Sequence, residues 1–355
     1  MTKNYTIFVD MAENIGRRIR EYIIKVLNGM ALGLFASLII GLILQQIGVY
    51  SGIELIERFG RAGQHLMGPA IGVGVAYSVG ASPLGLFAAV VTGALGAGTV
   101  VQADAGLMLA IGEPVGALLA SLAGAEVAKR IQGRTKMDII LVPATAILVG
   151  GLTGAFLAPA VAALMSAIGE FINLLTGLYP LPMGALVAVS MGMILTLPIS
   201  SAAIAISLGL SGLAAGAATI GCACQMVGFA TASFRENRYA GLVSQGLGTS
   251  MIQIPNIVKN PRIWVPPIVA SALLGPVGTV VFGMESNRIG AGMGTSGLVG
   301  QFATIETMGT AGIPGILLLH FVLPAVITLA VSEYMRRKNW IRSGDMALHV
   351  QGSVS

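Results

Sequence analysis

Long apolar segments recur along the whole chain, and they constrain the fold more than any motif does. They extend from the first fifth of the sequence almost to its end, so neither a single anchor nor a cleaved signal peptide accounts for them. Only 10% of the 355 residues are charged, against about 25% in a soluble protein. The sequence therefore predicts an all-α polytopic membrane protein with about ten transmembrane helices. The predicted spans lie near residues 28–48, 64–80, 83–101, 104–126, 138–158, 160–178, 182–208, 212–232, 262–284 and 308–331.

Basic residues gather in three short stretches that flank the apolar segments. Under the positive-inside rule such stretches mark the cytoplasmic side, so both termini are expected in the cytoplasm. Contact of the same residues with anionic lipid headgroups predicts the same sidedness. Nucleic acid is not an expected partner, because no aromatic residues alternate with the charges. The basic residues are Lys3, Arg17, Arg18, Arg20 and Lys25, then Lys129, Arg130, Arg134 and Lys136, then Arg336, Arg337, Lys338 and Arg342.

The same pattern divides the chain into one membrane domain and two short polar ends. Residues 1–27 include "DMAENIGRRIREYIIK" (10–25), which is typical of a basic amphipathic helix lying on the inner leaflet. Residues 28–335 are expected to form a single transmembrane domain, and residues 336–355 a cytoplasmic tail. Each end is too short to bury a core of its own.

Two segments do not fit as plain spans. Residues 240–258 lie between the basic runs "FRENRY" and "KNPR", and residues 289–306 lie between two outward-facing helix ends. Each must therefore enter and leave the membrane from one side, which predicts two re-entrant segments in addition to the spans. Non-helical backbone at membrane depth is tolerated where protein or a water-filled cavity satisfies its hydrogen bonds, and transporters place binding sites there.

A carboxylate interrupts the apolar run "GLMLAIGEPVGALLASLAG" (106–124). A charged side chain at the centre of a span costs roughly 2.5 to 3.5 kcal/mol on insertion scales, so Glu113 is expected to face a cavity or a partner. Pro114 disfavours helical geometry at Glu113 and removes a backbone donor. Glu113 could bind the hydroxyls of a solute or carry a proton. In the structural alternative, it pairs with a basic residue and locks two helices.

Four runs of the sequence carry a resemblance to a known family. They are "GEPVGALLASLAGAEVAKRIQGRTKMDIILVPATAI" (112–147), "LPISSAAIAISLGLSGLAAGAATIGCACQMVGFA" (197–230), "GTSMIQIPNIVKNPRIWVPP" (248–267) and "GAGMGTSGLVGQ" (290–301). These runs resemble the standalone membrane subunit IIC of the bacterial phosphotransferase system, and within it the branch named after the perfringolysin O regulator. The resemblance covers the chain from about residue 28 to residue 335.

This resemblance implies a homodimeric carrier with an elevator-like architecture in the inner membrane of a bacterial cell. It implies that Glu113 and Pro114 form the family's Glu-Pro element, whose carboxylate holds sugar hydroxyls. The family also uses a histidine near the sugar, whereas His320 in "LLLHFVLP" is equally explained by helix packing. Separate IIA and IIB proteins are expected partners, because Cys222 and Cys224 lie in an apolar segment where they cannot serve as a phosphate carrier.

Further polar residues of the two re-entrant segments complete the predicted solute site. The two Gly-Thr-Ser turns could present hydroxyls and free amides to one ligand at the membrane midplane, although ordinary loop chemistry explains them as well. Gln225 is read either as an interhelical hydrogen bond or as a cavity residue. The predicted site residues, besides Glu113 and Pro114, are Thr249, Ser250, Gln253, Asn256, Thr295, Ser296, Gln301 and Glu306.

These features predict an IIC-like permease for a small polar solute, above all a sugar or sugar derivative, that works by alternating access around the Glu-Pro site. The alternative is a membrane sensor that acts indirectly on gene expression. No catalytic centre, cofactor or metal site is expected, so any enzymatic role would be that of the permease subunit of a sugar phosphotransferase system.

Overall fold

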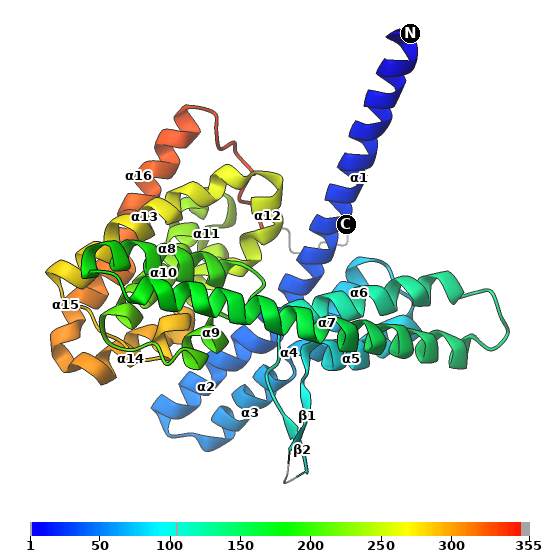
Figure 1. The fold of residues 1–355 in the computed structure, drawn as a ribbon, viewed down its shortest axis with the longest axis horizontal. Helices are drawn as coiled ribbons and strands as arrows, with labels where there is room; N and C mark the ends of the chain where they lie inside the picture. Colours follow the sequence, from blue (N-terminus) through cyan, green and yellow to red (C-terminus); the bar gives the residue numbers. More distant parts are fainter. Residues whose placement is uncertain (1, 104–105, 349–355) are drawn as a thin grey trace.

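The computed structural model describes residues 2–103 and 106–348 and is almost entirely helical. The helices form two lobes, and the long helix α7 (Asp138–Thr176) runs from one to the other (Figure 1). The first lobe contains the elements before α7, and the second lobe those after it. The predominance of helices agrees with the predicted all-α fold.

The first lobe is built around α1 (Thr2–Leu34), which continues through a π-helical turn, η1 (Phe35–Ile39), into α2 (Ile40–Ser51). Small residues let α4 approach α1 closely, since a Cβ atom added at Gly29 would lie 2.3 Å from the carbonyl oxygen of Gly74. The remaining elements are α3 (Glu54–His65), α4 (Met67–Ser78), α5 (Pro83–Ala97), the antiparallel hairpin of β1 (Val100–Ala103) and β2 (Gly106–Leu109), and α6 (Pro114–Ile131).

The second lobe surrounds α10 (Gly212–Ala232), in which every residue from 215 to 230 is buried. A helix that is apolar on all sides lies in the interior of a larger structure, and here α8, α13 and α16 pack around α10. The other α-helices are α8 (Pro180–Thr196), α9 (Ser201–Ser207), α11 (Phe234–Val243), α12 (Ile254–Lys259), α13 (Val265–Pro276), α14 (Val299–Met308), α15 (Ile313–Gly315) and α16 (Leu323–Arg337).

Short 3-10 and π-helical pieces join these helices. Four of these eight pieces lie in the two segments that are predicted to be re-entrant, which therefore consist of short, broken helices and not of continuous spans. The pieces are η2 (Ser244–Gly248), η3 (Ser250–Gln253), η4 (Pro261–Trp264), η5 (Val277–Val281), η6 (Gly290–Gly292), η7 (Ser296–Leu298), η8 (Gly309–Gly312) and η9 (Ile316–Val322).

Five helical stretches of the described residues are long and apolar enough to cross a membrane, and two shorter apolar helices accompany them. These stretches agree with a membrane protein, whereas the count of about ten spans stays a prediction. The five are Ile15–Ser51, Asp138–Thr176, Gly212–Ala232, Pro261–Val281 and Ser296–Arg337, and the shorter two are Pro83–Ala97 and Pro180–Thr196.

The span predictions were wrong in three places. The span expected at 182–208 is divided, because α8 ends at Thr196 and α9 begins only at Ser201. The spans expected at 138–158 and 160–178 are one continuous helix of 39 residues, because Pro159 lies inside α7 without breaking it. Such a helix is about 58 Å long, nearly twice the hydrocarbon thickness of a bilayer. The span expected at 104–126 begins as the β-hairpin, and helix α6 starts only at Pro114. Gly106 and Gly112 adopt positive φ angles there, which a helix does not accommodate.

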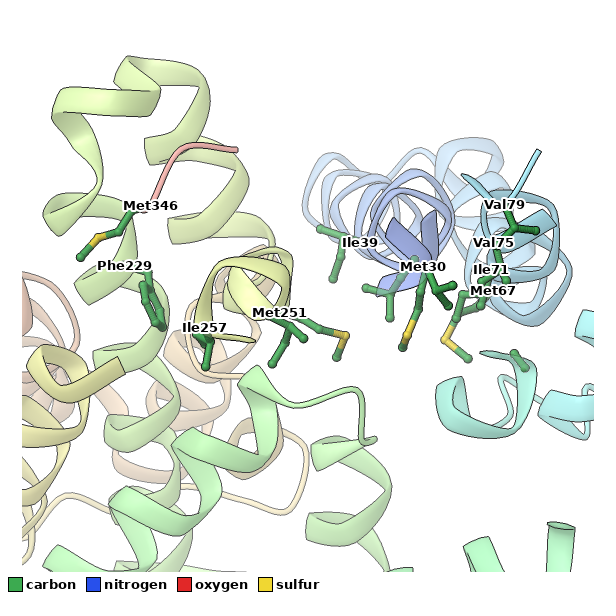
Figure 2. Packing of buried hydrophobic residues seen from close by; sticks show 14 of the residues in the cluster. Met30, Ile39, Met67, Ile71, Val75, Val79, Phe229, Met251, Ile257 and Met346 are labelled. Carbon is green, nitrogen blue, oxygen red and sulfur yellow. The ribbon is translucent and has the colours of Figure 1, made fainter. Parts of the chain in front are cut away.

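Apolar packing joins the two lobes through α1. Met30 and Leu34 of α1 belong to one buried cluster with Ile71 of α4 and with Met251 and Ile257 of the second lobe. Figure 2 shows Met30, Met67, Ile71, Val75 and Val79 on one side of this cluster and Met251, Ile257, Phe229 and Met346 on the other. Helix α1 therefore lies between the two lobes and packs against both.

A buried ion pair fixes the end of α16 to α11. Arg336 lies 2.8 Å from Glu236 and also donates to the carbonyl oxygen of Ala232 at 3.1 Å. The two charged side chains are only 11% and 6% exposed. Removing one partner of such a pair leaves a buried charge uncompensated, which costs about 3 to 5 kcal/mol.

We therefore expect Arg336→Met to lower the thermal unfolding temperature of the purified protein by several degrees. The matched control is Arg235→Met, because Arg235 pairs with Glu333 at 3.0 Å but its side chain is 68% exposed. Melting curves of both variants in detergent test this expectation. Equal and small shifts of the melting temperature in the two variants would show that the buried pair does not stabilise the contact between α16 and α11.

Candidate functional site

The loop before α6 holds the backbone of Glu113 in place. The Glu113 amide donates to the carbonyl oxygen of Ala97 at the end of α5, over 2.9 Å. Gly112 adopts the left-handed conformation, with φ of +80°, and packs against the same carbonyl group. A Cβ atom added at Gly112 would lie 2.4 Å from that oxygen. Pro114 is the buried first residue of α6, a position that suits the fixed φ of proline. The Glu-Pro break predicted from the sequence is therefore a rigid helix start.

The carboxylate of Glu113 reaches the second lobe. It lies beside the backbone of Ser200, in the unwound stretch between α8 and α9. Its Oε2 atom is buried and has no hydrogen-bond partner. Among the side chains that the structure describes, those of residues 15–101, 106–206 and 208–348, no basic group forms an ion pair with Glu113. The described part of the chain thus offers no cation to lock this acid, and its Oε2 atom is left without a hydrogen-bond partner in the protein.

A second unpartnered polar group adjoins the other end of the same stretch. Gln225 of α10 accepts hydrogen bonds from Trp264 at 2.8 Å and from Thr196 at 3.3 Å, both at its Oε1 atom. Its Nε2 atom is buried without a partner. Leaving such a buried donor unpaired costs about 1 to 3 kcal/mol. The stretch from Leu197 to Ser200 therefore has an open acceptor, Glu113, at one end and an open donor, Gln225, at the other.

The two Gly-Thr-Ser turns contact each other in the structure. The hydroxyl of Thr295 donates to the carbonyl oxygen of Gly246 at 2.5 Å, and the hydroxyl of Ser296 donates to that of Gly248 at 2.8 Å. Thr249 is 4% exposed, and its side chain accepts from the amide of Met251, which caps η3. The hydroxyls are thus used to satisfy backbone groups between the two segments.

Ser250 links these turns to the unwound stretch. Its hydroxyl lies 2.8 Å from that of Thr196, which in turn contacts Gln225. Residues 240–258 are here named the inner segment. Of the predicted site residues on this segment, Ser250 is therefore the one that joins the polar network around Gln225. The contact connects the last turn of α8 with η3.

Four other predicted residues lie elsewhere. Gln253 and Asn256 donate to backbone carbonyls of Met346 and Ala347 near the end of the described chain. Gln301 is 5% exposed and bonds His320, whose Nδ1 atom lies 3.0 Å from its side-chain nitrogen. No hydrogen bond or ion pair among the described residues joins these three side chains to Glu113.

Glu306 is separate again, because it is exposed and accepts from the side chain of Asn287 at 3.0 Å. It borders a cavity of about 420 Å³ between α2 and α14, together with Gln46, Tyr50 and Phe302. The rings of Tyr50 and Phe302 lie 4.0 Å apart in this wall. Glu306 therefore faces an open cavity away from the Glu113 loop.

Three residues of the network were not predicted as site residues: Thr196, Ser200 and Trp264. Pro198 interrupts an apolar run, which signals a helix break and therefore free backbone groups beside it. The indole N–H of a tryptophan within an apolar segment also needs an acceptor. Neither signal identifies the partner, since the contacts bridge 39 residues in the case of Trp264 and Gln225.

Comparison with known proteins gives one match. Residues 24–348 match the family model described as "Phosphotransferase system, EIIC". No curated protein and no solved structure matches the chain. The matched region covers the Glu113 loop, the unwound stretch and both Gly-Thr-Ser turns.

The geometry of the Glu113 loop makes Gly112 sensitive to substitution. We expect Gly112→Ala to lower the melting temperature by several degrees, because the new methyl group would clash with the carbonyl of Ala97 in addition to straining the backbone. Gly133→Ala is the matched control, since Gly133 has φ of +78° and open space around its Cα. Left-handed geometry alone costs an alanine roughly 1 to 2 kcal/mol. Equal decreases of the melting temperature in both variants would show that close packing of Gly112 against Ala97 does not stabilise the loop.

Proposed function

Because the chain belongs to the EIIC family of the phosphotransferase system, as the match over residues 24–348 shows, we propose that it carries a sugar or sugar derivative across the membrane by alternating access. Family membership makes it a membrane permease of the phosphotransferase type and favours this role over a regulatory sensor. The observation that carries the proposal is the buried, unpartnered Oε2 atom of Glu113 at the contact between the lobes.

The chemistry of the open groups supports a hydroxylated solute. Oε2 of Glu113 can only accept when ionised, and Nε2 of Gln225 can only donate. A hydroxyl group does both, so a molecule with several hydroxyls can satisfy the two sites together. Buried polar atoms that lack a protein partner are expected to have one in a bound molecule or water. Glu113, Ser200 and Gln225 are therefore the proposed ligands, with Trp264 and Thr196 holding Gln225 in position.

The arrangement of the lobes supports alternating access. The first lobe contributes Glu113 on a rigid loop, and the second contributes the unwound stretch that it touches. Because the site lies between two bodies, movement of one lobe against the other would open it to one side at a time. We propose that this movement is of the elevator type and that two copies of the chain form a dimer, as in sugar-carrying IIC subunits.

Phosphorylation, if coupled to this transport, requires separate proteins. Cys222 and Cys224 are fully buried in α10, where Cys222 lies 3.6 Å from the carbonyl oxygen of Met191. Neither thiol can reach a soluble phosphate donor. We propose that separate IIA and IIB proteins dock at the side that carries the basic residues around Arg134 and Arg337, which would be the cytoplasmic face of the inner membrane.

A screen for the solute tests the role of Glu113. Purified protein is heated with sugars, sugar acids and polyols, because a ligand of the folded state raises the melting temperature. We expect one compound to stabilise the native chain and to bind Glu113→Gln at least tenfold more weakly, since a hydrogen bond to a charged group contributes about 1.5 to 3 kcal/mol. Uptake of the same compound into proteoliposomes should fall in parallel.

The matched control is Glu126→Gln. Glu126 is also an acid of the α6 region, but it pairs with Lys129 at 2.8 Å and accepts from Tyr22 at 2.6 Å. The Glu126→Gln substitution should therefore leave solute binding unchanged. A stably folded Glu113→Gln protein with native affinity and uptake would refute the proposed site.

A further inference from the structure

The last part of the described chain folds back over the second lobe. After α16, a turn with Asn339 in the left-handed region, at φ of +57°, reverses the chain. Residues 340–348, here named the C-terminal strap, then pass beside α11 and α12. Ile341 is 2% exposed and Met346 is fully buried, and both belong to the apolar cluster that joins the lobes. Figure 2 shows Met346 next to Phe229 in that cluster.

Side-chain amides of the second lobe hold the backbone of the strap. The carbonyl oxygen of Met346 accepts from Asn237 at 2.8 Å and from Gln253 at 3.0 Å. Asn237 also accepts from the amide of Leu348 at 2.8 Å, which makes its contact with the strap two-sided. Asn256 donates to the carbonyl oxygen of Ala347 at 2.9 Å.

The remaining end of the strap is tied in the same way. Asn260, directly after α12, donates to the carbonyl oxygen of Trp340 at 3.0 Å and to the carboxylate of Asp345 at 2.8 Å. The strap is therefore bound at both ends by amides of one short segment, residues 253–260, and by Asn237. A segment held only by chance packing would not satisfy so many buried polar groups at once.

The strap is also connected to the proposed solute site. Gln253 donates to Gln245 at 2.8 Å, and Gln245 donates to Ser233 at 2.9 Å, so the strap extends a buried row of amides. Three residues before Gln253, Ser250 contacts Thr196 in the network around Gln225. One short helical turn, η3, thus has the strap at one end and the solute network at the other.

We propose that the C-terminal strap acts as a lock, which means that it holds the inner segment in place and prevents its movement. When docked, it holds η3 and α12 against α1 and occupies the amides of Gln253 and Asn256. When released, it frees these amides and lets the inner segment move, which opens the path from the site to the side of the chain termini. This inference rests on the proposed function, because it assigns a regulation to the same site.

Reversible tethering of the full chain tests the lock. Leu348 and Ser244 line one small cavity of about 130 Å³ between the strap and α1. We would replace both with cysteine in a chain carrying Cys222→Ala and Cys224→Ala, and join them with a flexible bis-methanethiosulfonate reagent. Tethering should reduce solute uptake into proteoliposomes at least tenfold, and dithiothreitol should restore it. Each single-cysteine variant, treated identically, is the control.

A second measurement needs no transport. Ile252 lines the same cavity, so Ile252→Cys in the same background reports how open the inner segment is. We expect a chain that ends before Asp345 to react with a membrane-impermeant maleimide at least fivefold faster than the full chain. Tethering of the full chain should slow the reaction of the same cysteine.

The outcomes separate the lock from the proposed function. Faster labelling without the strap, in a chain that transports no solute, would support the lock and refute the permease site. Full uptake by the tethered protein, or a labelling rate that neither tethering nor truncation changes, would overturn the lock while leaving the solute site intact.

Discussion

Within a membrane, a buried polar group has no water to bond, so it must find a partner in the protein or in a bound molecule. The structure meets this demand by joining distant segments. Thr295 and Ser296 satisfy the carbonyls of Gly246 and Gly248 in the other re-entrant segment, and amides of the second lobe satisfy the backbone of the C-terminal strap. Against this background, the open atoms of Glu113 and Gln225 stand out, because they adjoin the same unwound stretch and lack partners. They are two of nine buried side-chain atoms without a partner among the described residues, and the proposed function follows from their shared position beside this stretch.

The same demand explains the contact that the unwound stretch after α8 makes with the other lobe. Unwinding α8 after Thr196 frees backbone groups that protein must then cover, and the Glu113 loop of the other lobe covers one of them at Ser200. Close backbone contacts make this possible, since Gly112 brings the loop against Ala97 where a larger residue would not fit. A site built from the rigid loop of one body and the opened backbone of another can be assembled or separated by relative motion, which is what a carrier requires.

Local patterns in the sequence predicted the elements well where one segment decides its own structure. The span expected at 212–232 coincides with α10, and the helix break expected at Pro114 occurs. The continuous α7 was missed because proline inside an apolar helix is tolerated when neighbours and small adjustments satisfy the freed carbonyl. The partners of Glu113 and Gln253 were missed for another reason. They lie about 90 residues away in the sequence, as Met346 does from Gln253, and no local periodicity records such contacts.

The central claim is that Glu113 binds the solute directly between the lobes. The most direct measurement is the rate at which an apolar carbodiimide modifies Glu113, followed by mass spectrometry with and without each candidate sugar. The account predicts that one sugar slows modification of Glu113 severalfold and leaves that of Glu126 unchanged, because only the first carboxylate would be covered. A sugar that is transported by the protein but leaves the reaction of Glu113 unaltered would contradict the account and place the solute elsewhere.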